Sequence, residues 1–207
     1  MIQIIDCEQN SPEWFQARAG IPTASKFSTV MASGRGGKES KTREDYLYDL
    51  AGEVITGKPT EGFSNAHTER GHEHEPKARE LYSFMADATI EQVGFIRNGD
   101  KGASPDGLVG SNGLFEAKSK LPRLLIKALF RDEVPPEHKA QCQGALWVAE
   151  REWIDIVVYW PDMPLFIKRA YRDEAYIASI ATAVKQFNEE LAEIVAKVRS
   201  YGMKEAA

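Results

Sequence analysis

The sequence predicts a single α/β domain in which helices flank a mixed central β-sheet. A chain of 207 residues has the size of one ordinary domain and is long enough to bury a sizeable core. Helical and strand patterns follow one another as helices, a run of strands, two helices, two strands and a last helix, the order of an α/β layer fold. Hydrophobic residues make up 43% and charged residues 28% of the chain, as in ordinary globular proteins.

Helices are expected through the N-terminal part of the chain. Ser11 is suited to cap a short helix to about residue 19 that begins at Pro12, and Thr23 is suited to cap a second helix to about residue 31. Longer helical patterns cover residues 41–56 and 65–85.

Strand patterns, which are short runs rich in β-branched and aromatic residues, occur in two groups. They cover residues 89–96, 103–109, 114–119, 153–160 and 165–171. Helices are expected between the groups at 122–130 and 136–148. Asp173 is suited to cap a long amphipathic helix that runs to about residue 201.

Composition indicates the cellular compartment of the protein but does not decide whether it binds nucleic acid. The net charge of −5 does not exclude nucleic acid, because basic residues recur locally between residues 18 and 43 and between residues 118 and 131. No apolar run approaches the length of a membrane span and the N-terminus lacks signal-peptide features, so no membrane partner is expected. Cys7 and Cys142 are too few for a disulfide framework or a thiolate cluster, which favours the reducing cytoplasm.

The most informative stretch is residues 104–118, which has the pattern of a β-hairpin. Its two apolar strand segments are joined by Gly110-Ser-Asn-Gly113, a turn of residues that tolerate positive φ. Glu116 and Lys118 are expected to share one face of the second strand, and the hairpin folds Asp106 back towards Glu116. Two carboxylates and one ammonium at a strand end are the minimal set for holding Mg²⁺ and cleaving a phosphodiester.

The hairpin alone fits a metal site and an ordinary surface hairpin equally well. The string Glu-x-Lys occurs four times in the chain, and most such pairs are solvated ion pairs that contribute little to stability. Only the pair at 116 and 118 follows an Asp across a turn and lies in an apolar strand pattern.

Two helices offer further polar groups to such a site. Glu75 lies one turn from Arg79 on one helix face, and Pro76 favours a kink or a helix start at this point. A third carboxylate would complete an oxygen-rich site of the kind that suits Mg²⁺ or Mn²⁺, although this helix taken alone fits a solvated acidic turn better. Gln141 is suited to present its amide to a water molecule or a phosphate, or else is an exposed helical glutamine.

Zinc is a poor alternative for the histidines of this region. His67, His72 and His74 alternate with acidic residues, but residues two apart point to different sides of a helix. Solvated histidines, or one histidine behind the ligands, fit the spacing better.

Together these residues resemble the phage-lambda-exonuclease type of the PD-(D/E)xK nuclease superfamily, which includes the YqaJ-like viral recombinases. The resemblance runs from about Trp14 to Trp147 and implies a restriction-endonuclease-like fold. Four blocks carry it: Trp14-Phe-Gln-Ala-Arg18 with Thr23-Ala-Ser25; Gly71-x-x-x-Glu75-Pro-x-Ala78; Ser104-Pro-Asp106-Gly107 leading to Glu116-Ala-Lys118; and Ala140-Gln141-x-Gln143-x-x-x-Trp147-Val148.

The resemblance implies one nuclease domain over residues 1–207. Its parts are N-terminal helices at 11–57, a catalytic core at 65–171 and a C-terminal helix at 173–201.

It also implies the ligands of a metal centre. Asp106 and Glu116 would be the principal ligands, the carbonyl of Ala117 would complete the coordination, and Glu75 would be an outer or second-metal acid. Two Mg²⁺ ions are expected, and Mn²⁺ is expected to substitute for them.

The remaining matched residues are given catalytic and DNA-binding roles by the same resemblance. Lys118 would orient the attacking water and stabilise charge at the scissile phosphate, and Gln141 would help to position that water or Lys118. Arg18, Ser25 and Ser104 would form the pocket for a terminal 5′-phosphate.

The chain departs from the family pattern at two places. His138 stands where relatives often have Tyr, which leaves its role open. A further acid that some relatives have before the Ser-Pro-Asp-Gly block corresponds either to Asn98 or to Asp100.

The implied function is a Mg²⁺-dependent 5′→3′ exonuclease that degrades one strand of linear double-stranded DNA and leaves a 3′ single strand for phage-type recombination. A free 5′-phosphorylated DNA end, a homotrimeric ring and a single-strand annealing protein are the implied partners, in the bacterial cytoplasm as a phage or prophage product. The alternatives are an endonuclease or junction resolvase on the same core and, less well matched because every catalytic residue is present, a non-catalytic DNA-binding module.

Overall fold

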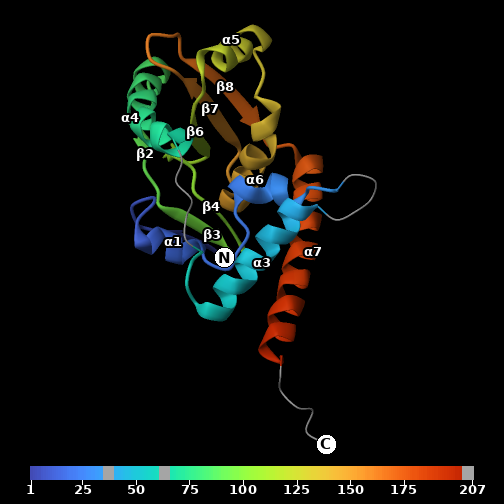
Figure 1. Cartoon of the computed structure of the whole chain (residues 1–207). Coiled ribbons are helices and arrows are strands. Elements are labelled where there is room, and N and C mark those ends of the chain that lie inside the picture. The colour runs from blue at the N-terminus through green and yellow to red at the C-terminus, as the bar shows by residue number, and fades with distance from the viewer. Residues whose placement is uncertain (35–39, 61–65, 202–207) are drawn as a thin grey trace, which may run out of the picture.

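The computed structural model describes residues 1–34, 40–60 and 66–201, with the side chains of residues 66–68 outside the description. Its elements follow the order of the sequence (Figure 1). They are β1 (Ile2–Ile5), α1 (Pro12–Arg18), the 3₁₀ turn η1 (Ala24–Lys26), α2 (Phe27–Val30), α3 (Lys41–Thr56), α4 (Ala66–Ala86), β2 (Ile90–Glu91), β3 (Phe95–Asn98), β4 (Lys101–Ala103), β5 (Gly107–Val109), β6 (Gly113–Ser119), α5 (Pro122–Arg131), the 3₁₀ turn η3 (Pro136–His138), α6 (Lys139–Ala149), β7 (Trp153–Tyr159), β8 (Phe166–Tyr171) and α7 (Glu174–Arg199).

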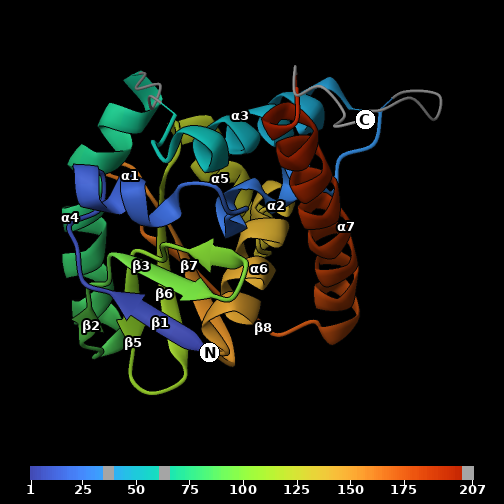
Figure 2. The ribbon, with the colours of Figure 1, turned by 90° about the horizontal axis from the view of Figure 1, so that it is seen from below.

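The central sheet has five strands in the order β2-β5-β6-β7-β8. Only β6 and β7 are parallel, so the sheet is mixed, as predicted. One face packs against α4 through Ala78, Tyr82 and Phe115, and the opposite face packs against α6, which in turn contacts α7. Figure 2 shows the same layering from below, with α4 on one side of the molecule and α7 on the other. The α/β fold with helices on both faces of a mixed sheet is therefore confirmed.

A second, antiparallel sheet of β1, β3 and β4 was not predicted. The patterns at 89–96 and 103–109 each divide into two strands that join different sheets, so the prediction of two continuous strands was wrong. Gly94 and the Ser104-Pro105 step lie at the two breaks, and a Cβ at Gly94 would lie 2.3 Å from the carbonyl oxygen of Cys7. The Gln9 side chain bonds both breaks at once, because its Nε2 donates to Val93 O (2.8 Å) and Pro105 O (3.0 Å).

The predicted hairpin is present as β5 and β6, paired from Gly107–Phe115 to Val109–Gly113. Gly110 takes the positive φ, 55°, that the turn requires. Gly113 is needed for a different reason, since a Cβ there would lie 2.2 Å from the Trp153 ring. The turn chemistry and the close packing against β7 thus fix the register of the strand that carries Glu116.

Two buried polar side chains hold the elements around the sheet. Gln143 of α6 donates to Tyr171 O (2.8 Å) and accepts from Asp173 N (2.7 Å), which ties the turn between β8 and α7 to α6. Asp155 of β7 is fully paired, because Tyr82 (2.7 Å) and the Nε and Nη2 atoms of Arg169 (2.9 and 2.8 Å) donate to its carboxylate. Within the described residues, no helix is both long and apolar enough to cross a membrane.

The contact between α6 and α2 yields a stability prediction. A Cβ at Gly144 would lie 2.3 Å from the buried ring of Phe27, so Gly144→Ala should destabilise the fold by about 1–3 kcal/mol through overpacking. Gly52, on the exposed side of α3, has no neighbour within 4 Å of its Cβ position, so Gly52→Ala should instead stabilise by about 0.5–1 kcal/mol.

Urea unfolding of both variants measures the difference as a change in midpoint at constant slope. Equal stability of the two variants would contradict the close contact between α6 and α2.

Candidate active site

The candidate site lies in a fork where two paired strands separate. β5 and β6 pair only as far as Gly107 and Phe115, because the chain before residue 107 turns away to β4 while β6 continues beside β7. Residues 116–119 therefore have no strand beside them on this edge in the described part of the chain. The carboxylate of Asp106 takes the place of a strand and accepts a hydrogen bond from Ala117 N (2.7 Å).

The same edge exposes a backbone carbonyl. In an extended strand the N–H and C=O of one residue point to the same side, so the carbonyl of Ala117 faces the fork together with the N–H that bonds Asp106. A backbone oxygen and the Asp106 carboxylate are thereby placed side by side.

Glu116 points to the opposite face of β6, towards α6, and is only 2% exposed. Its Oε1 accepts from Lys118 Nζ (2.6 Å) and from Gln141 Nε2 (2.6 Å). Its Oε2 is buried and has no hydrogen-bond partner among the described residues. The structure thus brings together Glu116, Lys118 and Gln141 as expected. One oxygen of the Glu116 carboxylate, Oε2, is left without a hydrogen bond in the described residues.

Glu75 reaches the site from α4. It lies in the middle of a continuous helix that includes Pro76, so Glu75 is not at a helix start. Its carboxylate forms an ion pair with Arg79, one turn away. Glu75, Asp106, Ala117 and Lys118 line one cavity of about 260 Å³.

The electrostatics of this cavity favour a cation. Burial, and then the negative charges of Glu116 and Glu75, raise the pKa of Asp106 well above its ordinary value. Burial also raises the pKa of Glu75, against the opposing charge of Arg79. Burial disfavours the ammonium of Lys118, but the carboxylates of Glu116 and Asp106 prevail and raise its pKa. The negative charges of Asp106, Glu116 and Glu75 are therefore opposed mainly by two cations in these interactions, Lys118 and Arg79.

The residues present fit a hard divalent cation. Carboxylates and a backbone carbonyl are the ligands that Mg²⁺ prefers, and the buried Oε2 of Glu116 is an acceptor without a hydrogen-bond partner among the described residues. As they stand, no three His, Cys, Asp or Glu side chains of the described residues are gathered closely enough to hold a metal ion. His74 bonds Ser119 whereas His72 is exposed, and the side chain of His67 lies outside the described residues.

A second polar group lies on the other branch of the fork, around Ser104. Arg18 Nη1 donates to Ser104 Oγ (3.3 Å), and Trp14 Nε1 donates to the same oxygen (2.8 Å). The guanidinium of Arg18 lies 3.8 Å from the centroid of the Trp14 ring. Burial lowers the pKa of Arg18. Arg18 and Ser104 are thus brought together, two residues before Asp106, as the resemblance implied.

Ser25 joins this group only indirectly. It is exposed and contacts Thr23 Oγ1 (3.3 Å), while Thr23 is 3% exposed and lies 3.5 Å from Arg18 Nη2. Thr23 stands at the start of η1 as expected, but its hydroxyl makes no capping bond there. Thr23 and Trp14 are the site residues that the sequence reasoning missed, although both belong to the first matched block.

The positions left open by the sequence lie outside the cavity. Asn98 Nδ2 donates to Val148 O (3.1 Å), and Asp100 accepts from Asn188 of α7 (2.8 Å), so both contact helices at the other side of the small sheet. The side chain of His138 is 13% exposed and its Nε2 is buried without a hydrogen-bond partner among the described residues. Burial and the charges of Lys118 and Lys120 lower the pKa of His138 to about 3, so it is a neutral neighbour of these two lysines.

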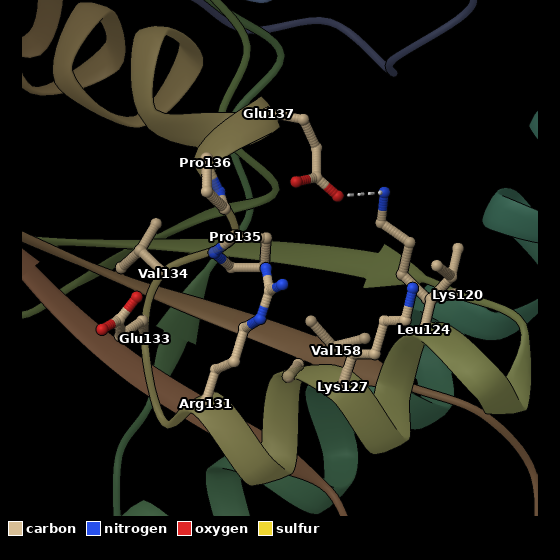
Figure 3. A pocket seen from close by; sticks show the side chains of 11 residues that line it. Lys120, Leu124, Lys127, Arg131, Glu133, Val134, Pro135, Pro136, Glu137 and Val158 are labelled. Atoms are coloured by element: carbon tan, nitrogen blue, oxygen red, sulfur yellow. Dashed lines mark hydrogen bonds and ion pairs between the residues drawn. The ribbon is translucent and has the colours of Figure 1, made fainter.

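A separate cavity of about 220 Å³ lies between α5 and η3 (Figure 3). Lys120, Lys127 and Arg131 stand around an apolar lining, and Lys120 forms an ion pair with Glu137 (3.4 Å). None of the predicted catalytic residues lines it, so the chemistry is assigned to the cavity in the fork.

Comparison with known proteins identifies the family of this chain. The model of the YqaJ-like viral recombinase domain matches residues 13–152, which include every matched block. No match was found among curated protein sequences.

Solved structures of exonucleases are also similar to this chain. The alkaline exonuclease LHK-Exo from Laribacter hongkongensis is 33% identical over 91% of this chain and 96% of its own, with a TM-score of 0.81. The structure of LHK-Exo in complex with dAMP is also 33% identical, over 94% of this chain and 100% of its own, with a TM-score of 0.83. A phage-related exonuclease from Haemophilus somnus 129PT is 15% identical over 86% of this chain and 96% of its own, with a TM-score of 0.64, and shows the same fold.

The raised pKa of Asp106 predicts how the metal-free protein responds to pH. An acid whose folded pKa is raised supports folding when protonated and opposes it as pH rises above its unfolded value of about 4. Asp106→Asn keeps an oxygen for Ala117 N–H but removes the charge, so it should raise the melting temperature in EDTA at neutral pH by a few degrees. The gain should disappear below about pH 4.

Thermal unfolding with and without Mg²⁺ completes this test. Mg²⁺ should stabilise the wild type and should have little effect on Asp106→Asn. Equal stabilisation of both proteins would remove Asp106 from the metal site.

Proposed function

We propose that this chain, which belongs to the YqaJ-like viral recombinase family, is a Mg²⁺-dependent 5′→3′ exonuclease that degrades one strand of linear double-stranded DNA. The observation that carries the proposal is the fork itself. The carboxylate of Asp106, two residues after Ser104, is bonded to Ala117 N on the strand that carries Glu116 and Lys118, and Ser104 is bonded to Arg18.

Each side chain has a distinct chemical task in this proposal. Asp106, Glu116 and the Ala117 carbonyl would hold two Mg²⁺ ions, with Glu75 as an outer ligand, and Mn²⁺ would substitute. Bound ions supply stabilisation of the attacking and leaving oxygens in an in-line displacement. Lys118, oriented by Glu116, adds positive charge where negative charge grows on the phosphate. Gln141 holds the Glu116 carboxylate in place from α6.

The Arg18–Ser104 pair gives the reaction its direction. A guanidinium fixed on an aromatic ring and beside a hydroxyl is suited to a terminal phosphate. With the 5′-phosphate held there by Arg18, Ser104 and Thr23, and with Ser25 at the rim, the next phosphodiester lies near Asp106. The substrate would therefore be shortened from its 5′ end, which leaves a 3′ single strand for homologous recombination.

The relatives support this assignment. LHK-Exo, which is one third identical to this chain, is described as an alkaline exonuclease and is found in complex with dAMP, a 2′-deoxynucleoside monophosphate. Release of such a nucleotide is what hydrolysis at a 5′-phosphorylated end would produce.

The biological setting is proposed on the same basis. Residues 1–207 would act as one nuclease domain in a homotrimer, with a single-strand annealing protein as partner. The protein would work in the cytoplasm of a bacterium that carries the phage or prophage.

A first test separates an exonuclease from an endonuclease or junction resolvase. With Mg²⁺, the wild type should degrade linear duplex DNA and leave a closed circle intact, because an exonuclease requires an end. Lys118→Ala should reduce the rate on linear DNA by about 100-fold or more. Lys185→Ala, which removes a 79% exposed lysine from α7, should act like the wild type. Cleavage of the circle would favour the endonuclease, and full activity of Lys118→Ala would refute its role.

A second test addresses the 5′ pocket. The wild type should prefer 5′-phosphorylated over 5′-hydroxyl ends, and Arg18→Lys should lose about tenfold or more of this preference because it lacks the guanidinium fork. Initial rates on matched duplexes measure the preference. Equal use of both ends by the wild type would argue against the pocket.

A further inference from the structure

The cavity in the fork has a second polar end that the proposed catalytic residues do not use. Ser119 lies there on β6, and its Oγ is 2.9 Å from His74 Nδ1 and accepts from Arg70 Nε (3.3 Å). His74 and Ser119 both line the cavity together with Asp106 and Lys118. A hydroxyl, an imidazole and a guanidinium that meet beside a metal centre form a set suited to an anion.

Ser119 and His74 together carry one more hydrogen-bond donor than their mutual contact uses. Ser119 carries one O–H, and a neutral imidazole carries one N–H. The contact between Ser119 and His74 uses one of these two protons, whichever tautomer His74 adopts. The other proton, which is on either Ser119 Oγ or His74 Nε2, is not used by this contact.

Aromatic contacts hold the donors in place. The ring of His74 makes T-shaped contacts with the rings of Tyr159 and Trp160, at centroid distances of 5.4 and 5.6 Å. The guanidinium of Arg70 lies 5.4 Å from the centroid of Trp160. A cation over an aromatic face is stabilised by the ring quadrupole. The positive charge of Arg70 is thus held on the α4 side of the fork.

The position of Ser119 indicates which anion it meets. Ser119 lies two residues beyond Ala117 on the same face of β6, a distance of about 6.6 Å along the strand. This is comparable with the separation of neighbouring phosphates in one DNA strand. Ser104 and Ser119 lie on the two separate branches of the fork, with Asp106 and Ala117 between them.

We propose that Ser119, Arg70 and His74 bind the phosphate that follows the scissile phosphate towards the 3′ end of the degraded strand. The inference rests on the proposed exonuclease function and adds a third contact to it. The strand runs from the Arg18–Ser104 pair, across the metal ligands, to Ser119. These three are positioning residues, since they touch the substrate away from the reacting atoms.

The test removes the charge of that one phosphate. The substrate is a 5′-phosphorylated duplex with a methylphosphonate in place of the phosphate after the scissile one, and single-turnover release of the first nucleotide is measured. The wild type should slow about tenfold or more on this substrate, as expected for loss of a charge-assisted hydrogen bond. Ser119→Ala and Arg70→Gln should be slow on both substrates and should not distinguish them.

Matched controls separate this contact from general effects. His74→Phe keeps a ring against Tyr159 and Trp160 but removes the hydrogen bond, so it should also lose part of the discrimination. Lys77→Gln removes an exposed cation of the same helix, one that pairs with Glu80 (2.8 Å), and should discriminate like the wild type. A methylphosphonate four phosphates further along should slow none of the proteins.

The outcomes are distinct. If Ser119→Ala slows by the same factor as the wild type on the modified substrate, or if the wild type is indifferent to the modification, the subsite is overturned. If the wild type fails to release a nucleotide from the unmodified duplex, the exonuclease function itself is overturned and the subsite with it.

Discussion

The hydrogen bond from Ala117 N–H to the Asp106 carboxylate is the interaction on which the site depends. It replaces the strand pairing that ends at Gly107 and Phe115 and so holds two diverging chain segments at a fixed separation. One segment continues to the small sheet and carries Ser104, and the other continues along β7 and carries Lys118 and Ser119. Because the Asp106 carboxylate bonds Ala117 N across the fork, it also points into the cavity between the two segments.

Asp155 and Glu116, the two buried acids of the central strands, differ in how completely their carboxylates are hydrogen-bonded. Asp155 is 3% exposed, and every oxygen of its carboxylate is bonded by Tyr82 or Arg169. Glu116 is 2% exposed but leaves Oε2 without a partner in the described structure. A buried acceptor without a hydrogen bond is costly, so folding alone explains the arrangement of Asp155. The ion pair of Glu116 with Lys118 leaves Oε2 unsatisfied, and a ligand that bonded this oxygen would remove that cost.

The sequence was sufficient for the parts of this site that depend on local spacing. The hairpin, the shared face of Glu116 and Lys118, and the helix carrying Gln141 follow from strand and helix periodicity. The division of 89–96 and 103–109 between two sheets does not, because it depends on the bond of Gln9 to Val93 and Pro105 from far away in the chain. Thr23 was assigned to a helix cap for the same reason, since its contact with Arg18 is invisible to a local pattern.

The fork also explains how one short segment can couple recognition of an end to cleavage. Ser104 and Asp106 are separated only by Pro105, whose fixed φ and whose carbonyl, bonded by Gln9, limit the freedom of this step. A group held by Ser104 is therefore held at a set distance from the carboxylate of Asp106. If the 5′-phosphate binds at Arg18 and Ser104, the distance of the scissile bond from the end is determined by the backbone and not by the sequence of the DNA. Such a site removes nucleotides from an end without reading bases, which is what stepwise degradation of arbitrary DNA requires.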